Sequence, residues 1–508
     1  MQNETPNTGP RFLKNWFFSL LSWALPLCLA FVSTPILVRG LGTEQYGIYA
    51  VILGFLNYTF STGIGKVGAK YIPESRAARS PAVLSDSLSA AMLLTLGIGI
   101  LQAAVLAVAT PYIVRDMLVI SGAESEAART ALYLAALSGF ILMVSQVFQF
   151  SLQGLHRFGL FAIGTNIGAA LSAVGNILLV FNGFGIVALL IWNAVAVSFA
   201  AAFFAVKVKP LLPEWQPKFS ISKQTFAAVA RYSGSIIIYQ TLTSILFIFE
   251  RSWISRKFGP EAVSFYVVPM MLAIYMHGLL ASFAQVLFPL VNELLNDKER
   301  LLAVYRRATR LVLLLMAFIL SGYFGLGQAF LGLWINPAFA ERSYALLVIL
   351  GAAFAFNIMS MIVWLLAEAF RAPGLNALSS TIWTTTAIPL MIWMSEIWQS
   401  EGVALGRLIG VLFTIPLIFF IEKRFLGRRM WSLWVGLILR LIPSVAAAAL
   451  AERYIVQWFS PSWASLFAGF FVGSAFFGVI VFLAGYFDPD DFAVVRPYLP
   501  FVRRQVAR

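Results

Sequence analysis

Two stretches of the sequence share one pattern: RGLGTEQYGIYAV at Arg39–Val51 and RKFGPEAVSFYVV at Arg256–Val268. Each copy carries Arg, Gly, Glu and Tyr at the same positions, and each stands between two long apolar runs. The glycine suits a tight turn, and the glutamate two residues later suits a helix start, where the macrodipole favours acids. The chain therefore contains one type of helix–turn–helix corner twice.

Two further matches follow in the same order along the chain. QGLHRFGLFA at Gln153–Ala162 corresponds to EAFRAPGLNA at Glu368–Ala377, an offset of 215 residues. Gly185 corresponds to Gly402 at an offset of 217 residues, which is also the offset of the first pair. Three ordered matches at a nearly constant offset predict an internal duplication.

The composition predicts a membrane protein. Of the 508 residues, 60% are hydrophobic and only 11% are charged, with a mean hydropathy of +0.84. A soluble chain of this length needs more charged surface. Apolar runs recur near the ~20 residues that cross the hydrocarbon, and they do not alternate with polar residues as barrel strands do. We therefore expect an all-α polytopic membrane protein.

The breaks between apolar runs predict fourteen membrane spans. They lie near 15–38, 46–70, 83–110, 129–153, 158–181, 186–206, 232–255, 262–291, 311–334, 343–369, 374–395, 402–421, 431–451 and 463–486. The repeat groups them into an N-terminal six-helix bundle (15–206), a linker (207–231), a second six-helix bundle (232–421) and two additional helices (431–486). An even number of spans makes the halves parallel repeats facing a shared cleft, as in transporters.

The net charge of +14 follows the expected topology. Most Lys and Arg residues fall in the connections on the N-terminal side of the membrane, which predicts that both termini are cytoplasmic. Anionic lipid headgroups account for these basic clusters, so nucleic acid is not an expected partner. One cysteine and two histidines exclude a disulfide framework and make a metal centre improbable, and we expect no cofactor.

The span plan and two motifs resemble a known family. The motifs are TPILVRGLGTEQYGIYAVILGF at Thr34–Phe55 and STGIGKVGAKYIPE around Gly63–Tyr71. Together they resemble the polysaccharide transporter (oligosaccharide flippase) family, in the superfamily of lipid II flippases and multidrug and toxin extruders (the MOP superfamily). The resemblance implies transfer of polyprenyl-diphosphate-linked oligosaccharides, such as O-antigen or exopolysaccharide precursors, from the inner to the outer leaflet of the bacterial cytoplasmic membrane. Polysaccharide polymerase or export proteins would be partners.

A diphosphate in the cleft would need fixed positive charge, and charges inside membrane spans are costly unless they serve a function. Lys66 and Lys70 stand at i and i+4 on one helical face, and Arg251 lies near the end of the seventh span. The lysines could instead anchor the chain to inner-leaflet headgroups. Arg251 could form a structural ion pair with its neighbour Glu250.

Three further arginines are candidates. Arg407 lies within a span, and Leu190 holds its place in the first half, so a structural role common to both halves does not explain it. Arg39 and Arg256 belong to the repeated corner, where a structural role as helix caps is favoured over contact with substrate.

Energy coupling needs titratable groups within or beside the spans. The candidates are Asp86, Glu250, His277 and Glu368. The unperturbed pKa of histidine suits a proton relay, although a single histidine on an apolar helix is more often a packing residue. A proton gradient, a sodium gradient or the membrane potential would supply the driving force.

Two other functions remain open. A drug or metabolite antiporter on the same fold would place acidic residues in the cleft, whereas the charges here lean basic. A membrane glycosyltransferase or polymerase would need a sizeable outer loop or paired carboxylates, and the expected outer loops are short.

Overall fold

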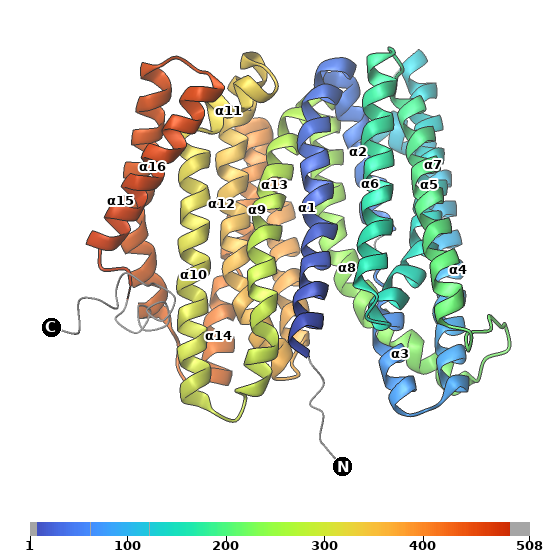
Figure 1. Ribbon diagram of the computed structural model, residues 1–508. Coiled ribbons are helices and arrows are strands. Elements are labelled where there is room, and N and C mark those ends of the chain that lie inside the picture. The colour runs from blue at the N-terminus through green and yellow to red at the C-terminus, as the bar shows by residue number, and fades with distance from the viewer. Residues whose placement is uncertain (1–7, 61, 121, 488–508) are drawn as a thin grey trace. The chain divides into compact units, whose positions relative to one another are not determined.

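The structure, a computed structural model, describes residues 8–60, 62–120 and 122–487 (Figure 1). Within these ranges every regular element is a helix, and twelve helices are long and apolar enough to cross a membrane. Lipid offers the backbone no hydrogen-bond partners, so a spanning chain must satisfy its own N–H and C=O groups. The expected all-α polytopic fold is confirmed. The two chain termini, expected in the cytoplasm, lie outside the described residues.

The contacts divide the chain into two compact units, residues 1–264 and 265–508. The helices of the first unit are α1 (Thr8–Leu41), α2 (Thr43–Thr59), α3 (Lys66–Ala77), α4 (Pro81–Tyr112), the π-helical η1 (Ile113–Met117), α5 (Ala123–Gly154), α6 (Phe158–Phe181), α7 (Ile186–Val208), the 3-10 helix η2 (Lys209–Leu211), α8 (Lys223–Phe258) and the start of α9 (Pro260–Glu293). The second unit contains the rest of α9, then α10 (Lys298–Gly325), α11 (Gly327–Trp334), α12 (Pro337–Ala369), α13 (Gly374–Leu412), α14 (Ile415–Leu426), α15 (Trp431–Trp458) and α16 (Trp463–Leu483).

The unit boundary falls at the second copy of the repeated corner, so α8 groups by contact with the helices before it. The division expected from the repeat, 15–206 and 232–421 with a linker and two added helices, concerns internal symmetry and stays a prediction.

The repeated corner has the same backbone in both copies. Gly42 (φ 80°, ψ 161°) and Gly259 (φ 86°, ψ 164°) both adopt positive φ, which glycine tolerates because it has no Cβ. Each donates its N–H to the carbonyl four residues earlier, Gly42 to Val38 at 3.1 Å and Gly259 to Ser255 at 3.0 Å. One local structure is therefore used twice.

The second matched pair also shares its backbone. His156 and Arg371 have φ values of 55° and 56°, which are uncommon for residues with a side chain. The N–H of His156 donates to the Gln153 carbonyl at 2.9 Å, and that of Arg371 to the Glu368 carbonyl at 3.0 Å. Both residues follow the end of a long helix, α5 or α12, and reverse the chain in the same way.

The second expected span, 46–70, is not one helix. The chain leaves α2 and begins α3 only after a buried segment that contains Thr62 and Gly63, and Gly63 has φ 68°. The Gln146 side chain on α5 donates to the Phe60 carbonyl at 3.2 Å, which satisfies one of the groups released by the break. Broken backbone at membrane depth is tolerated where it is buried in protein. The expectation of a continuous helix here was wrong.

The segment Gly374–Leu426 is long enough to count as one span, but α13 reverses direction inside it. Gln399 has φ 47° and ψ −127°, and the helix after it packs back on the helix before it. A Cβ at Gly406 would lie 2.5 Å from the Met391 N, and one at Gly410 would lie 2.6 Å from the Ala387 Cβ. These glycines let two antiparallel backbones touch, as small residues do between membrane helices. The reversal agrees with the separate spans expected at 374–395 and 402–421.

The linker expected at 207–231 is ordered against the start of α4. The Ser85 hydroxyl donates to the Gln216 carbonyl at 3.0 Å and accepts from the Gln216 N–H at 3.2 Å. The Lys218 Nζ lies 2.6 Å from the Asp86 Oδ1. The connection between α7 and α8 is therefore held against α4 by two hydrogen bonds and an ion pair.

Candidate functional site

Arg251 is a buried cation of the first unit. Its guanidinium carbon lies 5.0 Å from the centre of the Tyr58 ring on α2, and its Nη1 donates to the Phe247 carbonyl at 3.0 Å. Tyr58 and Phe247 stack at 4.6 Å, and Gly54 leaves room for the arginine stem. The side chain is 6% exposed, and its Nε has no hydrogen-bond partner within the described ranges. Arg251 thus keeps one charged donor available beside an aromatic platform.

The neighbouring Glu250 is fully buried on the same helix. The Arg251 Nη1 hydrogen bond goes to the backbone carbonyl of Phe247. The structural ion pair with Glu250 stays the alternative prediction for Arg251.

The two lysines of α3 differ in their surroundings. The Lys70 ammonium lies 4.3 Å from the centre of the Tyr232 ring on α8 and 5.0 Å from that of Tyr71. The two rings meet edge to face at 6.1 Å. Lys66, at the first position of α3, is exposed. Lys70 therefore helps to join α3 to α8, and Lys66 remains accessible to an anion.

We expect Lys70→Gln to lower the stability of the protein by about 1 kcal/mol, since it removes a cation–π contact with two rings. Lys66→Gln is the matched control, because its exposed side chain makes no such contact, and it should leave the melting temperature unchanged. Thermal unfolding of both purified variants in the same detergent checks this. Equal melting temperatures would contradict the structural role of Lys70.

Lys66 on α3 and Arg251 on α8 lie at different levels along the axis of α8. A Cβ at Gly63, whose nearest neighbours include the Lys66 side chain, would lie 2.8 Å from Ile236 on α8. Ile236 and Arg251 are separated by about 22 Å along the helix, at 1.5 Å per residue. The two cations therefore form successive positions and not a single cluster.

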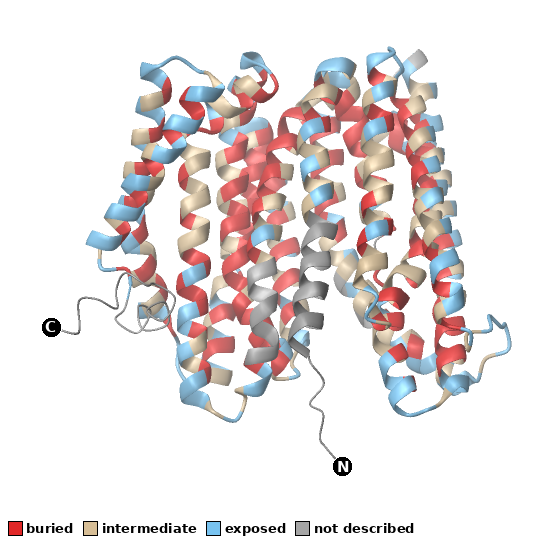
Figure 2. Cartoon of the chain, viewed as in Figure 1, coloured by how far each residue is buried: buried red, intermediate tan, exposed pale blue. Residues whose placement is uncertain are grey.

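Arg407 and His277 meet the same ring in the second unit. The Arg407 guanidinium lies 5.1 Å from Phe354 on α12 and 5.2 Å from Trp383 on α13. The His277 ring lies 5.9 Å from Phe354, and its side chain is hydrogen-bonded to Asn357. Arg407 is fully buried, and α12 is buried along most of its length (Figure 2). A substrate could reach Arg407 only if these helices moved apart.

The arginines of the repeated corner point to solvent or lipid. Arg39 and Arg256 are both exposed at the ends of α1 and α8. The polar groups beside them join the two copies: the Thr43 hydroxyl donates to the Glu261 Oε1 at 3.0 Å, and the Ser264 hydroxyl donates to the Thr43 carbonyl. These bonds support the structural interpretation of the corner.

Two of the coupling candidates take part in local structure. Glu368 accepts from the Asn376 amide at 3.2 Å across the turn between α12 and α13. Asp86 is paired with Lys218, as described above. The structure brings neither of them to Arg251 or Arg407 in a described contact.

Asp86→Asn and Lys218→Gln should each lower the stability of the protein by about 0.5 kcal/mol. The loss is small because both side chains are partly exposed. If the pair is only structural, the double variant should lose no more than either single variant. Thermal unfolding and the ion dependence of transport check this together. A change of ion dependence in Asp86→Asn alone would instead support a coupling role.

Sequence reasoning did not identify the aromatic partners of these cations: Tyr58, Tyr232, Phe354 and Trp383. The chain has 45 Phe, 16 Tyr and 14 Trp, so composition gives no way to select them. One usable signal was GVALGRLIG at Gly402–Gly410, with small residues four apart, which predicts close helix packing around Arg407.

The fold is shared with solved membrane proteins. It resembles the lipid II flippase MurJ in an inward closed conformation, with a TM-score of 0.73 at 13% identity, covering 92% of this chain and 98% of that chain. It also resembles a multidrug resistance MATE family transporter of the MOP superfamily in an inward-facing conformation, with a TM-score of 0.67 at 16% identity, covering 80% and 98%. At such identities the likeness shows a shared fold and nothing more.

The sequence then shows the family. The profile of the polysaccharide biosynthesis protein family matches residues 12–295, more than half of the chain, and the chain belongs to this family. A putative O-antigen transporter of Shigella flexneri is 23% identical, covering 81% of this chain and 98% of the relative. The succinoglycan biosynthesis transport protein ExoT of Rhizobium meliloti (strain 1021) is 24% identical, covering 94% of both chains. The resemblance seen in the sequence is thereby confirmed.

Proposed function

We propose that this protein is a flippase that moves a polyprenyl-diphosphate-linked oligosaccharide from the inner to the outer leaflet of the bacterial cytoplasmic membrane. The observation that carries the proposal is Arg251, a buried guanidinium with an available Nε in a membrane-spanning helix. Charged side chains in spans cost roughly 2.5–3.5 kcal/mol on insertion scales and usually mark substrate or ion pathways. Arginine is suited to phosphate because its planar fork can donate two parallel hydrogen bonds.

The different levels of Lys66 and Arg251 suggest the order in which they contact the substrate diphosphate. With cytoplasmic termini, the start of α8 is on the inner side, so Lys66 lies below Arg251. We propose that the exposed Lys66 meets the diphosphate in the inner leaflet and that Arg251 holds it nearer the outer face. Because about 22 Å separates their levels on α8, one diphosphate contacts them in turn.

Alternating access completes the proposal. The two six-helix bundles would change their relative position, with the repeated corners as hinge elements, while the polyprenyl chain stays in lipid. The relatives named as transporters of O-antigen and succinoglycan support this class of substrate. A proton or sodium gradient or the membrane potential would drive the cycle, and polysaccharide polymerase or export proteins would receive the product. The naming of both relatives as transport proteins supports a non-enzymatic role.

Reconstituted vesicles provide the test. Purified protein is placed in liposomes with a fluorescent undecaprenyl-diphosphate-linked oligosaccharide, and flipping is measured as protection of the sugar from an added glycosidase. We expect protein-dependent equilibration between leaflets. Uptake of cationic dyes without any movement of the lipid-linked sugar would favour the antiporter, and turnover of a glycosyl donor would favour an enzyme.

A further inference from the structure

Glu452 on α15 is a buried carboxyl group that the proposed function does not use. Its side chain is 2% exposed and lies between two glycine surfaces. A Cβ at Gly325 on α10 would overlap the Glu452 Oε2, and a Cβ at Gly473 on α16 would lie 2.5 Å from the Oε1. The carboxyl group therefore occupies a cradle in which the backbones of three helices come close together.

The partners of Glu452 contrast with those of Glu422, the other buried carboxyl group among the described residues of the second unit. Glu422 accepts from the Tyr305 hydroxyl at 2.6 Å, the Trp434 Nε1 at 2.7 Å and the Met430 N–H at 2.8 Å. Glu452 has no such set of donors, and its Oε2 has no hydrogen-bond partner among the residues that the structure describes. The Glu422 carboxyl group thus has three hydrogen-bond donors around it, and the Glu452 carboxyl group has no comparable set.

No ion pair or hydrogen bond joins Glu452 to a cation on the described helices packed against it. The sequences of α16 and α11 contain no ionisable residue. On α10 the nearest cation along the helix is Arg310, about 22 Å from Gly325. On its own helix Arg453 is exposed, and on α12 Glu341 is exposed and the Tyr344 hydroxyl donates to the Phe324 carbonyl. An isolated carboxylate in such surroundings is several kcal/mol less stable than the neutral acid.

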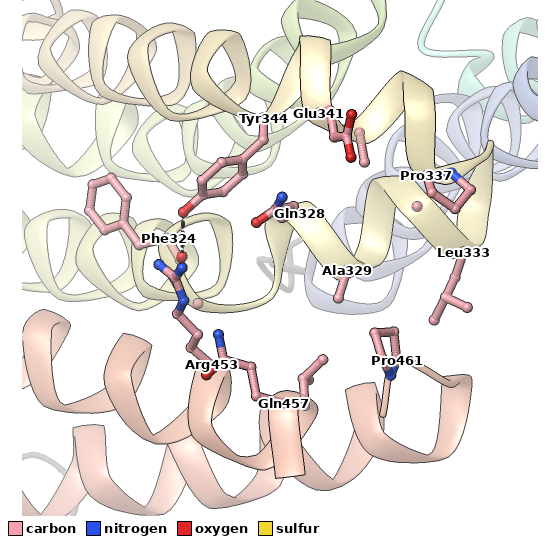
Figure 3. Close-up of a pocket in the computed structure, with 14 residues that line it drawn as sticks. Phe324, Gln328, Ala329, Leu333, Pro337, Glu341, Tyr344, Arg453, Gln457 and Pro461 are labelled. Carbon is pink, nitrogen blue, oxygen red and sulfur yellow. Dashed lines mark hydrogen bonds between the residues drawn. The ribbon is translucent and has the colours of Figure 1, made fainter. Parts of the chain in front are cut away.

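A cavity lies on the other side of Gly325 from this group. Residues of α10, α11, α12 and α15 line a cavity of ≈ 350 Å³. Arg453, Tyr344, Gln328 and Gln457 lie around it (Figure 3). Gly325, against which the Glu452 Oε2 lies, is part of the cavity wall. A cavity of this volume has room for several waters, and the glycine at its wall adds no side chain between the cavity and the carboxyl group.

We propose that Glu452 is a proton-binding site, a neutral carboxylic acid that exchanges its proton with this cavity through the gap at Gly325. The ligand is a proton and not a metal ion, because a single carboxyl group supplies too few oxygens for a cation cage. Across the described ranges no group of three His, Cys, Asp or Glu residues is available to hold a metal. The site lies in the last helical pair and is independent of the substrate contacts proposed for Arg251.

Dicyclohexylcarbodiimide labelling tests the site, since this apolar reagent reacts with protonated carboxyl groups. The full chain in lipid nanodiscs is treated at about pH 6 and about pH 9, and the labelled peptides are identified by mass spectrometry. We expect labelling at Glu452 to exceed that at Glu422 roughly tenfold at the lower pH, to fall at the higher pH and to vanish in Glu452→Gln. Protection by sodium at constant pH would overturn the assignment to a proton.

Infrared spectroscopy tests the protonation of Glu452 even if dicyclohexylcarbodiimide does not reach it. A carbonyl band of a protonated carboxyl group should be present in the wild type, absent in Glu452→Gln and shifted in D₂O. The band supports the proposal even without labelling. Absence of both the band and the label would show an ionised Glu452 and overturn it, and a band that does not shift in D₂O would overturn exchange with the cavity.

Discussion

Replacing Arg251 with Ala is expected to lower the rate of lipid-linked oligosaccharide flipping by roughly 10- to 100-fold. A hydrogen bond to a charged group contributes about 1.5–3 kcal/mol, and each 1.4 kcal/mol corresponds to a factor of ten. The variant also leaves the Tyr58 ring without its cation. The glycosidase-protection assay in reconstituted vesicles measures the effect.

Two variants control for charge and for folding. Arg256→Ala removes the same charge from the exposed end of α8 and should flip at the wild-type rate. Arg251→Lys keeps the charge but loses the planar fork, so its rate should fall between those of the wild type and Arg251→Ala. Wild-type flipping by Arg251→Ala, with a wild-type melting temperature, would remove Arg251 from the substrate path.

Replacing Gly406 with Leu is expected to disrupt the hairpin of α13 and to destabilise the second unit by about 3 kcal/mol or more. A Cβ at this position would lie 2.5 Å from the Met391 N and 2.6 Å from its Cα, so the two backbones must separate. Overpacking of this kind costs typically 1–3 kcal/mol, and more where backbone must move. Separation would also expose Arg407, which lies next in sequence. Thermal unfolding followed by tryptophan fluorescence measures the loss.

Gly478→Leu on α16 is the matched control. Gly478 is an exposed helical glycine, and a Cβ there would meet nothing within 4 Å. Since leucine has a higher helix propensity than glycine, this variant should be as stable as the wild type or slightly more stable. If Gly406→Leu melts at the same temperature as Gly478→Leu, the close approach in the α13 hairpin is wrong.

The sequence predicted the corners better than the helices between them. The matches at Gly42 and Gly259 were visible because a left-handed turn restricts residue choice, and the backbone there proved the same in both copies. The break between α2 and α3 was missed because the residues around it are apolar or small, so hydropathy continues across it. Its stability depends on Gln146 from α5, a contact that lies 86 positions away in sequence.

The candidate site shows a similar division. Lys66, Arg251 and Arg407 stood out because charge in an apolar run is costly wherever the run folds. Their present roles depend on partners distant in sequence. The Lys70 ammonium lies over the Tyr232 ring, and the Arg407 guanidinium lies between Phe354 and Trp383. The Arg251 Nε has no hydrogen-bond partner among the residues that the structure describes.

The sequence by itself determined the membrane fold, the repeated corners and the family, because hydropathy, glycine conformation and motif spacing are local properties of the chain. Only the tertiary structure decided which charged groups are satisfied. Glu422 and Glu452 are both glutamates in or beside apolar helices, yet one has three donors and the other lies between glycines. Such a difference arises from helix packing, since the neighbours of a buried side chain come from separate elements.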